Sequence, residues 1–328
     1  MSDSIWERIV PTTTLDPRYN PGDKVQLGVH DRVMDLFHKT WRTDPPDDKN
    51  LALASTFAVV AQFREAYDDY VAKVLHDNNN PSAISQVKAS MDAFAAAFAA
   101  TEVYIYDSVS GLWPKDYRRM DAANLAKFGI GGGGVSLADA GSGFYSMLYV
   151  KGTPGQAGAS YILASRGTDD PKDYISNAEQ NFGLPARQYS QGLAVAKAIT
   201  HAVDATHGRI IFAGHSLGGG IASLQGLAMR RPAFTFQAAG LSTATMLFNG
   251  VEFVDPSSYV TTFDYPGDWL DDVQTLGLLA SLPVGRKVTL STIALPAGAK
   301  NDTSGDRHLM NFVVPAMSQM LKAGAWPH

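Results

Sequence analysis

The chain has 328 residues, of which 45% are hydrophobic and 18% charged, and its 27 basic and 32 acidic side chains give a net charge of −5 at pH 7. This balance predicts a globular chain with a sizeable core. It argues against a disordered protein and against a dedicated nucleic-acid binder, which would carry a basic stripe. The lack of cysteine excludes thiol nucleophiles, disulfides and cysteine-ligated metal sites, and leaves the compartment open.

The first part of the chain has the pattern of helices. Apolar residues recur at intervals of three and four in residues 31–40 and 51–75, which is helical spacing. Asparagines and a proline end the second of these runs, and Ser82 is expected to cap a further helix that extends to residue 100. We therefore expect a helical N-terminal region.

From residue 143 the pattern changes to strands that alternate with helices. Strand-like runs lie at residues 144–150, 160–165, 209–213, 234–238, 259–263 and 287–291, and helical runs at residues 189–203, 217–229 and 308–321. Alternation of this kind predicts an α/β fold with a mostly parallel sheet flanked by helices. The glycine run 131–134 is interpreted as a connector. We expect a helical extension or cap over residues 1–135, packed on a catalytic domain over residues 136–328.

The motif Gly214-His215-Ser216-Leu217-Gly218 has the G-x-S-x-G form of a nucleophile turn. A short buried strand precedes it and a helix follows it, which is the context that this turn requires. The pattern predicts Ser216 as a nucleophile and the backbone N–H of Leu217 as a donor to an oxyanion. His215 cannot bond correctly to its neighbouring serine, so we expect its side chain to pack to one side as a satisfied polar group.

The sequence GHSLGGG, with ASRGTDD about fifty residues upstream, resembles class 3 lipases of the α/β-hydrolase superfamily and bacterial phospholipase-like enzymes. Those enzymes carry an F-R-G-T type strand end, and Ser165 stands here where an aromatic residue is usual. The resemblance covers roughly residues 143–320 and implies an α/β-hydrolase fold and lipid ester hydrolysis. It also implies a second oxyanion donor at Thr168, although a polar turn is an alternative for this segment. The helical first third resembles the leaders of bacterial lipase effectors only loosely.

The order of catalytic residues in this fold is serine, acid, histidine, so the general base should follow Ser216. Only His308 and His328 do so, and His328 is the final residue, which leaves His308 as the expected base. The acid is expected just past the fifth predicted strand, where Asp268 resembles the acid of the family in position. Asp264 stays open as the alternative acid. A calcium site in this acidic cluster is disfavoured because no EF-hand loop is present.

These features predict a serine hydrolase that cleaves carboxylic esters of lipids, of lipase or phospholipase A type, through an acyl-enzyme. A short-chain carboxylesterase and a non-catalytic hydrolase fold used for binding are the alternatives. We expect no cofactor, no metal and no nucleic-acid partner. The expected partners are a lipid or other ester substrate, a membrane surface contacted transiently, and, from the effector resemblance, a cognate inhibitor protein.

The start of the chain lacks the pattern of a signal peptide, and no apolar run reaches the ~20 residues needed to span a bilayer. The location is therefore left open between the cytoplasm and export by a non-classical bacterial route.

Overall fold

The computed structural model describes residues 48–77, 79–104, 116–131, 134–167, 187–252, 254–268, 270, 283–292 and 307–327. The helices in these ranges are α3 (Asp48–Asp77), α4 (Pro81–Glu102), α5 (Ala122–Lys127), α7 (Arg187–Ala205), α8 (Leu217–Met229), α9 (Thr243–Phe248) and α12 (Met310–Lys322), with a 3-10 turn at Pro256–Ser258. None of them combines the length and apolarity needed to cross a bilayer.

The strands form one mixed sheet. They are β1 (Tyr117–Arg119), β2 (Ala138–Asp139), β3 (Phe144–Lys151), β4 (Ser160–Ser165), β5 (Arg209–His215), β6 (Ala233–Phe236), β7 (Val260–Asp264) and β8 (Arg286–Thr289). Their order is β1-β3-β4-β5-β6-β7-β8, with β2 also paired to β3. Strands β4 to β8 are parallel, and β1, β2 and β4 each run antiparallel to β3. The predicted α/β fold with a mostly parallel sheet is confirmed.

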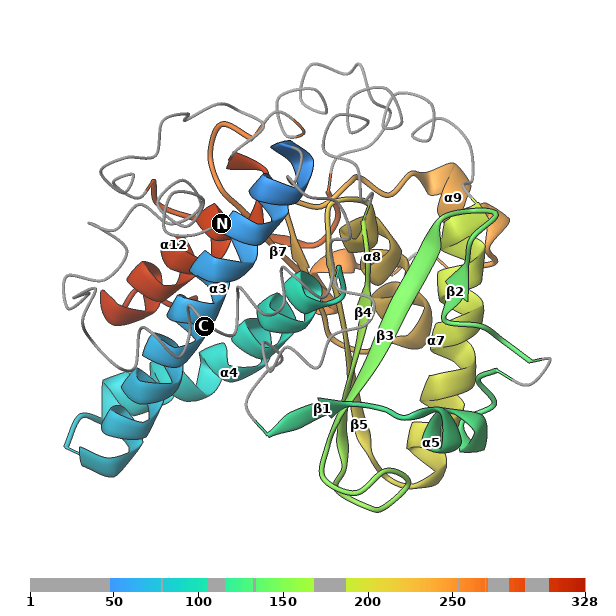
Figure 1. The fold of residues 1–328 in the computed structure, drawn as a ribbon, viewed down its shortest axis with the longest axis horizontal. Coiled ribbons are helices and arrows are strands. Elements are labelled where there is room, and N and C mark those ends of the chain that lie inside the picture. The colour runs from blue at the N-terminus through green and yellow to red at the C-terminus, as the bar shows by residue number, and fades with distance from the viewer. Residues whose placement is uncertain are drawn as a thin grey trace.

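Alternate residues of the central strands face opposite layers, as the two-residue period of a strand requires. In β5, Ile210 and Phe212 belong to the core that α7 and α8 cover, whereas Ile211 and Ala213 belong to the core that α3, α4 and α12 cover. Both faces of the sheet are therefore buried, which explains the continuous apolar runs of these strands. Figure 1 shows the sheet between these two groups of helices.

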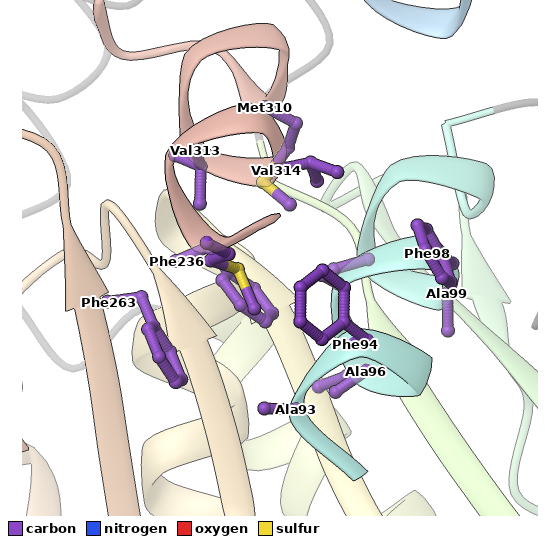
Figure 2. Close-up of a cluster of buried hydrophobic side chains, with 14 of the residues drawn as sticks. Ala93, Phe94, Ala96, Phe98, Ala99, Phe236, Phe263, Met310, Val313 and Val314 are labelled. Carbon is purple, nitrogen blue, oxygen red and sulfur yellow. The ribbon is translucent and has the colours of Figure 1, made fainter. Parts of the chain in front are cut away.

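Helix α4 connects the helical region to the sheet. Its alanine-rich second half is almost wholly buried, and small side chains let it lie close to β4, β5 and β6. Figure 2 shows Phe94 and Phe98 of α4 in one cluster with Phe236 of β6, Phe263 of β7 and the apolar side chains of α12. The described part of the N-terminal region thus shares its core with the sheet, and the division at residue 135 stays a prediction.

The structure corrects two helix starts. The residue that caps α4 is Asn80, whose side chain accepts the N–H of Ala83 at 3.0 Å, and not Ser82. Pro81 then takes the first helical position, where its missing N–H costs nothing. The last helix begins at Met310, so His308 lies just before it and not inside it. The predicted helix at residues 31–40, and also Thr168 and His328, lie outside the described residues.

Candidate active site

Ser216 occupies the turn between β5 and α8 in a conformation that few residues other than glycine adopt. Its φ is 57° and its ψ is −129°, and the residue is 4% exposed. Backbone strain of this kind persists only where the surrounding structure fixes it, and it concentrates at functional sites. The strand–turn–helix context predicted for Ser216 is confirmed.

Glycines and backbone hydrogen bonds hold this turn. A Cβ at Gly214 would overlap the carbonyl of Gly218, and a Cβ at Gly218 would overlap the carbonyl oxygen of Ser165 on β4. The carbonyl oxygen of Ser216 accepts the N–H groups of Gly219 at 2.8 Å and of Ala239 at 2.9 Å. The turn is therefore fixed from within α8 and from the segment that follows β6.

The Arg166-Gly167 pair lies beside the serine turn because Ser165 and Gly214 are register partners on β4 and β5. A Cβ at Gly167 would lie 2.7 Å from the His215 carbonyl oxygen and 3.1 Å from the Ser216 Cβ, so this segment touches the turn directly. Ser165 stands where the resembled lipases usually have an aromatic residue, and its hydroxyl oxygen lies 3.1 Å from that of Ser146 on β3.

His308 and Asp268 form a buried pair, each 1% exposed. Nδ1 of His308 lies 2.9 Å from Oδ1 and 3.0 Å from Oδ2 of Asp268, and Oδ1 also accepts the backbone N–H of Leu270 at 3.1 Å. An ionised carboxylate only accepts hydrogen bonds, so Nδ1 carries the proton and Nε2 of the neutral ring carries the lone pair. A general base needs that tautomer.

The structure also brings this pair to the serine turn. The ring centroids of His308 and His215 are 4.8 Å apart, and His215 is the residue before Ser216. The residues predicted for nucleophile, base and acid therefore gather at the carboxyl edge of the parallel strands, where ligands bind in open α/β sheets.

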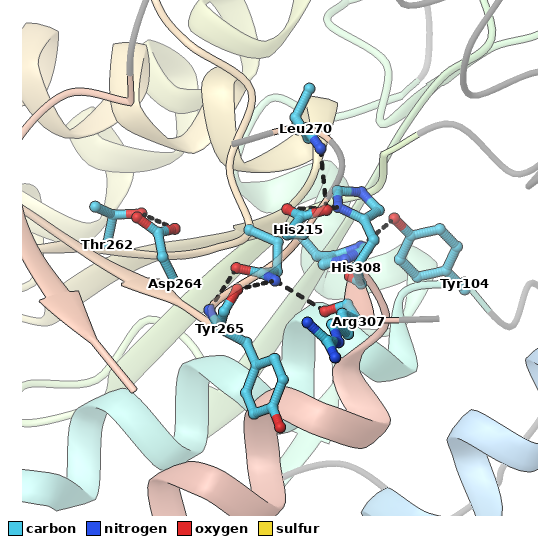
Figure 3. A network of polar contacts seen from close by, with 10 residues as sticks. Tyr104, His215, Thr262, Asp264, Tyr265, Leu270, Arg307 and His308 are labelled. Carbon is cyan, nitrogen blue, oxygen red and sulfur yellow. Dashed lines mark hydrogen bonds and ion pairs between the residues drawn. The ribbon is translucent and has the colours of Figure 1, made fainter. Parts of the chain in front are cut away.

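Asp264, the alternative acid, faces a different cation. Its Oδ2 lies 3.3 Å from Nζ of Lys287 on the neighbouring strand β8, and its Oδ1 accepts the Thr262 hydroxyl at 3.4 Å. Figure 3 shows it beside Thr262 and apart from the two histidines. This geometry favours Asp268 as the partner of His308.

His215 is a satisfied polar group, as the sequence predicts. Its Nε2 lies 2.7 Å from the carbonyl oxygen of His308, and its Nδ1 lies 3.0 Å from the hydroxyl of Tyr104. Burial lowers the pKa of His215 to about 3, and repulsion from His308 in its protonated form acts in the same direction. The ring of His215 is therefore neutral at physiological pH.

Tyr104 and Gln237 are site residues that sequence reasoning missed. Gln237, which directly follows β6, donates through Nε2 to the carbonyl oxygen of Arg307 at 2.9 Å and accepts the N–H of Tyr265 at 2.8 Å. It thereby links the segments that carry His308 and Asp268. Neither residue belongs to a motif, and Tyr104 meets His215 across 111 positions of the chain, so no pattern in the sequence could have found them.

Within the described ranges, no three His, Asp or Glu side chains lie close enough together to hold a metal ion. The arrangement can perform acyl transfer, because it combines a serine on a strained turn, a histidine in the tautomer of a base, and a carboxylate behind that histidine.

Comparison with known proteins agrees with this geometry. The model of a phospholipase-like family, described as a Tle-like phospholipase domain, matches residues 95–308, from within α4 to His308. An extracellular phospholipase A1 of Serratia liquefaciens is 34% identical over 218 residues, which is 64% of this chain and 60% of that protein. The chain thus matches about three fifths of the length of this relative. Because the family model covers more than half of the chain, the chain belongs to the Tle-like phospholipase family.

Proposed function

We propose that the chain is a serine hydrolase that cleaves carboxylic ester bonds of phospholipids. Ser216 is the nucleophile, His308 the general base, and Asp268 the carboxylate that orients the base. The observation that carries the proposal is the buried Asp268–His308 pair beside a strained serine turn. Membership of a phospholipase family and the name of the Serratia relative support phospholipids as the substrate class.

The proposed reaction has two halves. The Ser216 hydroxyl oxygen attacks the ester carbonyl carbon while Nε2 of His308 takes the hydroxyl proton. The tetrahedral intermediate then breaks its bond to the alcohol oxygen, which takes the proton from His308 and leaves as a lysophospholipid. Water deprotonated by His308 then attacks the acyl-serine. The second tetrahedral intermediate breaks its bond to the Ser216 oxygen, which takes the proton back from His308, and the fatty acid is released. Asp268 stays ionised and stabilises the imidazolium in both halves.

The oxyanion of each intermediate needs preorganised donors, each worth a few kcal/mol. Leu217 begins α8, so its N–H has no acceptor within the helix, and the positive end of the helix dipole lies at the serine turn. Gly167 touches the turn, which supports Thr168, the next residue, as the second donor. We therefore assign the oxyanion hole to Leu217 and Thr168.

Replacing the nucleophile tests the proposal. Ser216→Ala should lower fatty acid release from phosphatidylcholine vesicles by more than about 10³-fold, because only the serine oxygen can form the acyl-enzyme. Ser223→Ala is the matched control: this serine is also buried on α8, but its hydroxyl donates to the Gly219 carbonyl oxygen. We expect the control to stay within about threefold of the unmodified chain. Full activity of Ser216→Ala would contradict the mechanism.

Product analysis on phospholipids, triacylglycerols and p-nitrophenyl esters of graded chain length separates the substrate classes. We expect lysophospholipid and fatty acid from phospholipids. Activity confined to short esters would identify a carboxylesterase, and failure of a fluorophosphonate to label Ser216 would favour a binding protein.

The relative is named as extracellular, which supports export as the location. Transient contact with a membrane surface is part of the proposal.

A further inference from the structure

Tyr104 lies just past the end of α4 and reaches the active site through a chain of buried hydrogen bonds (Figure 3). The backbone N–H of Gly167 lies 3.1 Å from the Tyr104 hydroxyl, and that hydroxyl lies 3.0 Å from Nδ1 of His215. Nε2 of His215 then lies 2.7 Å from the carbonyl oxygen of His308. One tyrosine and one histidine thus connect three separate loops.

The direction of each hydrogen bond follows from the chemistry of its ends. The His308 carbonyl oxygen can only accept, so Nε2 of His215 donates, and Nδ1 of the same neutral ring is an acceptor. The Tyr104 hydroxyl must then donate to Nδ1, and its oxygen accepts the N–H of Gly167. Each of these hydrogen bonds therefore joins a donor to an acceptor, and the lowered pKa of His215 keeps the required neutral ring in place.

The three loops are those that the proposed reaction needs. Gly167 precedes Thr168, His215 precedes Ser216, and His308 is the base. We propose that Tyr104 and His215 are positioning residues, which hold the oxyanion segment and the base segment in register with the serine turn. This inference rests on the proposed function and deepens it, because it assigns a role in the site to the end of the helical region.

The fit around Gly167 shows why the position of the hydroxyl matters. A Cβ at Gly167 would lie 2.6 Å from the Tyr104 hydroxyl oxygen, so the absence of a side chain at Gly167 is what lets the hydroxyl lie this close to the backbone before Thr168. Loss of the hydroxyl leaves this N–H without its acceptor and lets the segment shift. A shift of about 1 Å in a catalytic constellation costs on the order of 10²-fold in rate.

The test compares three variants on phosphatidylcholine vesicles. Tyr104→Phe removes only the hydroxyl. His215→Leu removes both ring hydrogen bonds, whereas His215→Gln keeps a donor for the His308 carbonyl and an acceptor for the Tyr104 hydroxyl. Tyr67→Phe is the matched control, because it removes another buried tyrosine hydroxyl, 3.4 Å from that of Ser90 and away from the site. Folding of each variant is checked by circular dichroism, and the rate of Ser216 labelling by a fluorophosphonate is measured beside kcat and KM.

We expect Tyr104→Phe to lower kcat and the labelling rate about 10- to 100-fold, with KM within about threefold. His215→Leu should lose at least as much, His215→Gln should recover part of the loss, and Tyr67→Phe should match the unmodified chain. The positioning role is overturned if Tyr104→Phe stays within about twofold of the unmodified chain, or if His215→Gln is no better than His215→Leu. If the unmodified chain hydrolyses no ester, the proposed function itself fails. If the unmodified chain and all the variants are equally active, the proposed function stands and only the positioning role fails.

Discussion

Asp264 and Asp268 lie four residues apart at the end of β7, and both are buried, yet their partners differ. Asp268 accepts Nδ1–H of His308 at 2.9 Å, whereas Asp264 pairs with Lys287 at 3.3 Å. A carboxylate that orients the base and stabilises its protonated form lowers the barrier directly. A carboxylate paired with a lysine on the next strand instead adds an electrostatic contact between two strands of the sheet.

This difference predicts unequal effects of the same isosteric change. Asp268→Asn should lower kcat by about 10³- to 10⁴-fold, because an amide in its place cannot hold Nδ1 protonated and stabilise the imidazolium. Asp264→Asn should stay within about threefold. Steady-state kinetics on one phospholipid, with both variants checked for folding, measures the contrast. The opposite order of the two losses would move the acid to Asp264.

The residues of the site differ in how far the sequence could reveal them. The G-x-S-x-G motif and the chain order of the fold select Ser216 and His308 as candidates. For the acid, the resemblance to the lipase family favours Asp268 and leaves Asp264 open. Tyr104 and Gln237 could not be selected, because a buried tyrosine or glutamine is recognised only by the groups that surround it. Those groups come from distant parts of the chain, and spacing along the sequence carries no record of them.

In helix α8, close packing at its first residues outweighs the low helix propensity of glycine. Three glycines follow Leu217 in its first turn, although each glycine costs about 1 kcal/mol against alanine in a helix. A Cβ at Gly218 would overlap the Ser165 carbonyl oxygen, and a Cβ at Gly219 would lie 2.7 Å from that of Ala238. The glycines let α8 start close to β4 and to the segment after β6, and this keeps the serine turn tight.

Gly218→Ala should therefore destabilise the chain in spite of the better helix propensity of alanine. The added methyl group meets backbone, which cannot move aside cheaply, so we expect a loss of about 1–3 kcal/mol in the free energy of unfolding and reduced activity. Gly141→Ala is the control, because the nearest atom to its Cβ is the end of the Asp139 side chain. Denaturant titration measures both. Equal stability of the two variants would show that the close approach at Gly218 is not needed.

The sequence revealed the elements according to their length. The strand-like apolar runs at β3, β4 and β5 and the longer helical run at α8 are visible in the sequence, and the structure places elements over all of them. Strands of two or three residues such as β1 and β2, and six-residue helices such as α5 and α9, are too short to show a period. Their conformation depends on the sheet edge and the helix faces that they meet, which are known only after folding.

On the scale of the whole molecule, aromatic side chains join the helical region, the sheet and the C-terminal segment. Phe94 of α4 is fully buried, with its ring centroid 4.0 Å from that of Tyr67 on α3 and 5.4 Å from that of Trp326, which follows α12. Trp326 in turn lies 5.6 Å from Phe263 of β7. Stacked and tilted ring pairs of this kind add to the stabilisation from area burial.

A second connection is electrostatic. Glu102, the last residue of α4, is fully buried and pairs with Arg119 of β1 and with the hydroxyl of Tyr149 on β3. Removing one partner of a buried pair leaves an uncompensated charge, so this contact fixes where the end of α4 meets the sheet. Tyr104 follows two residues later, and its reach to His215 depends on that placement.

Phe94→Ala tests whether these parts unfold together. Loss of a buried phenylalanine costs about 3–5 kcal/mol, and Met91→Ala is the control, because Met91 lies on the same helix with 41% of its surface exposed. If α4 and the sheet share one core, Phe94→Ala should lower the protection of β5 amides against hydrogen exchange as much as that of α4 amides. Protection lost in α3 and α4 alone, with β5 unchanged, would instead identify the helical region as a separate folding unit. In that case the hydrogen bonds from Tyr104 to the active site would open without unfolding of the sheet, and activity would be lost on heating before the sheet unfolds. If the helices and the sheet unfold together, activity and global stability should be lost together.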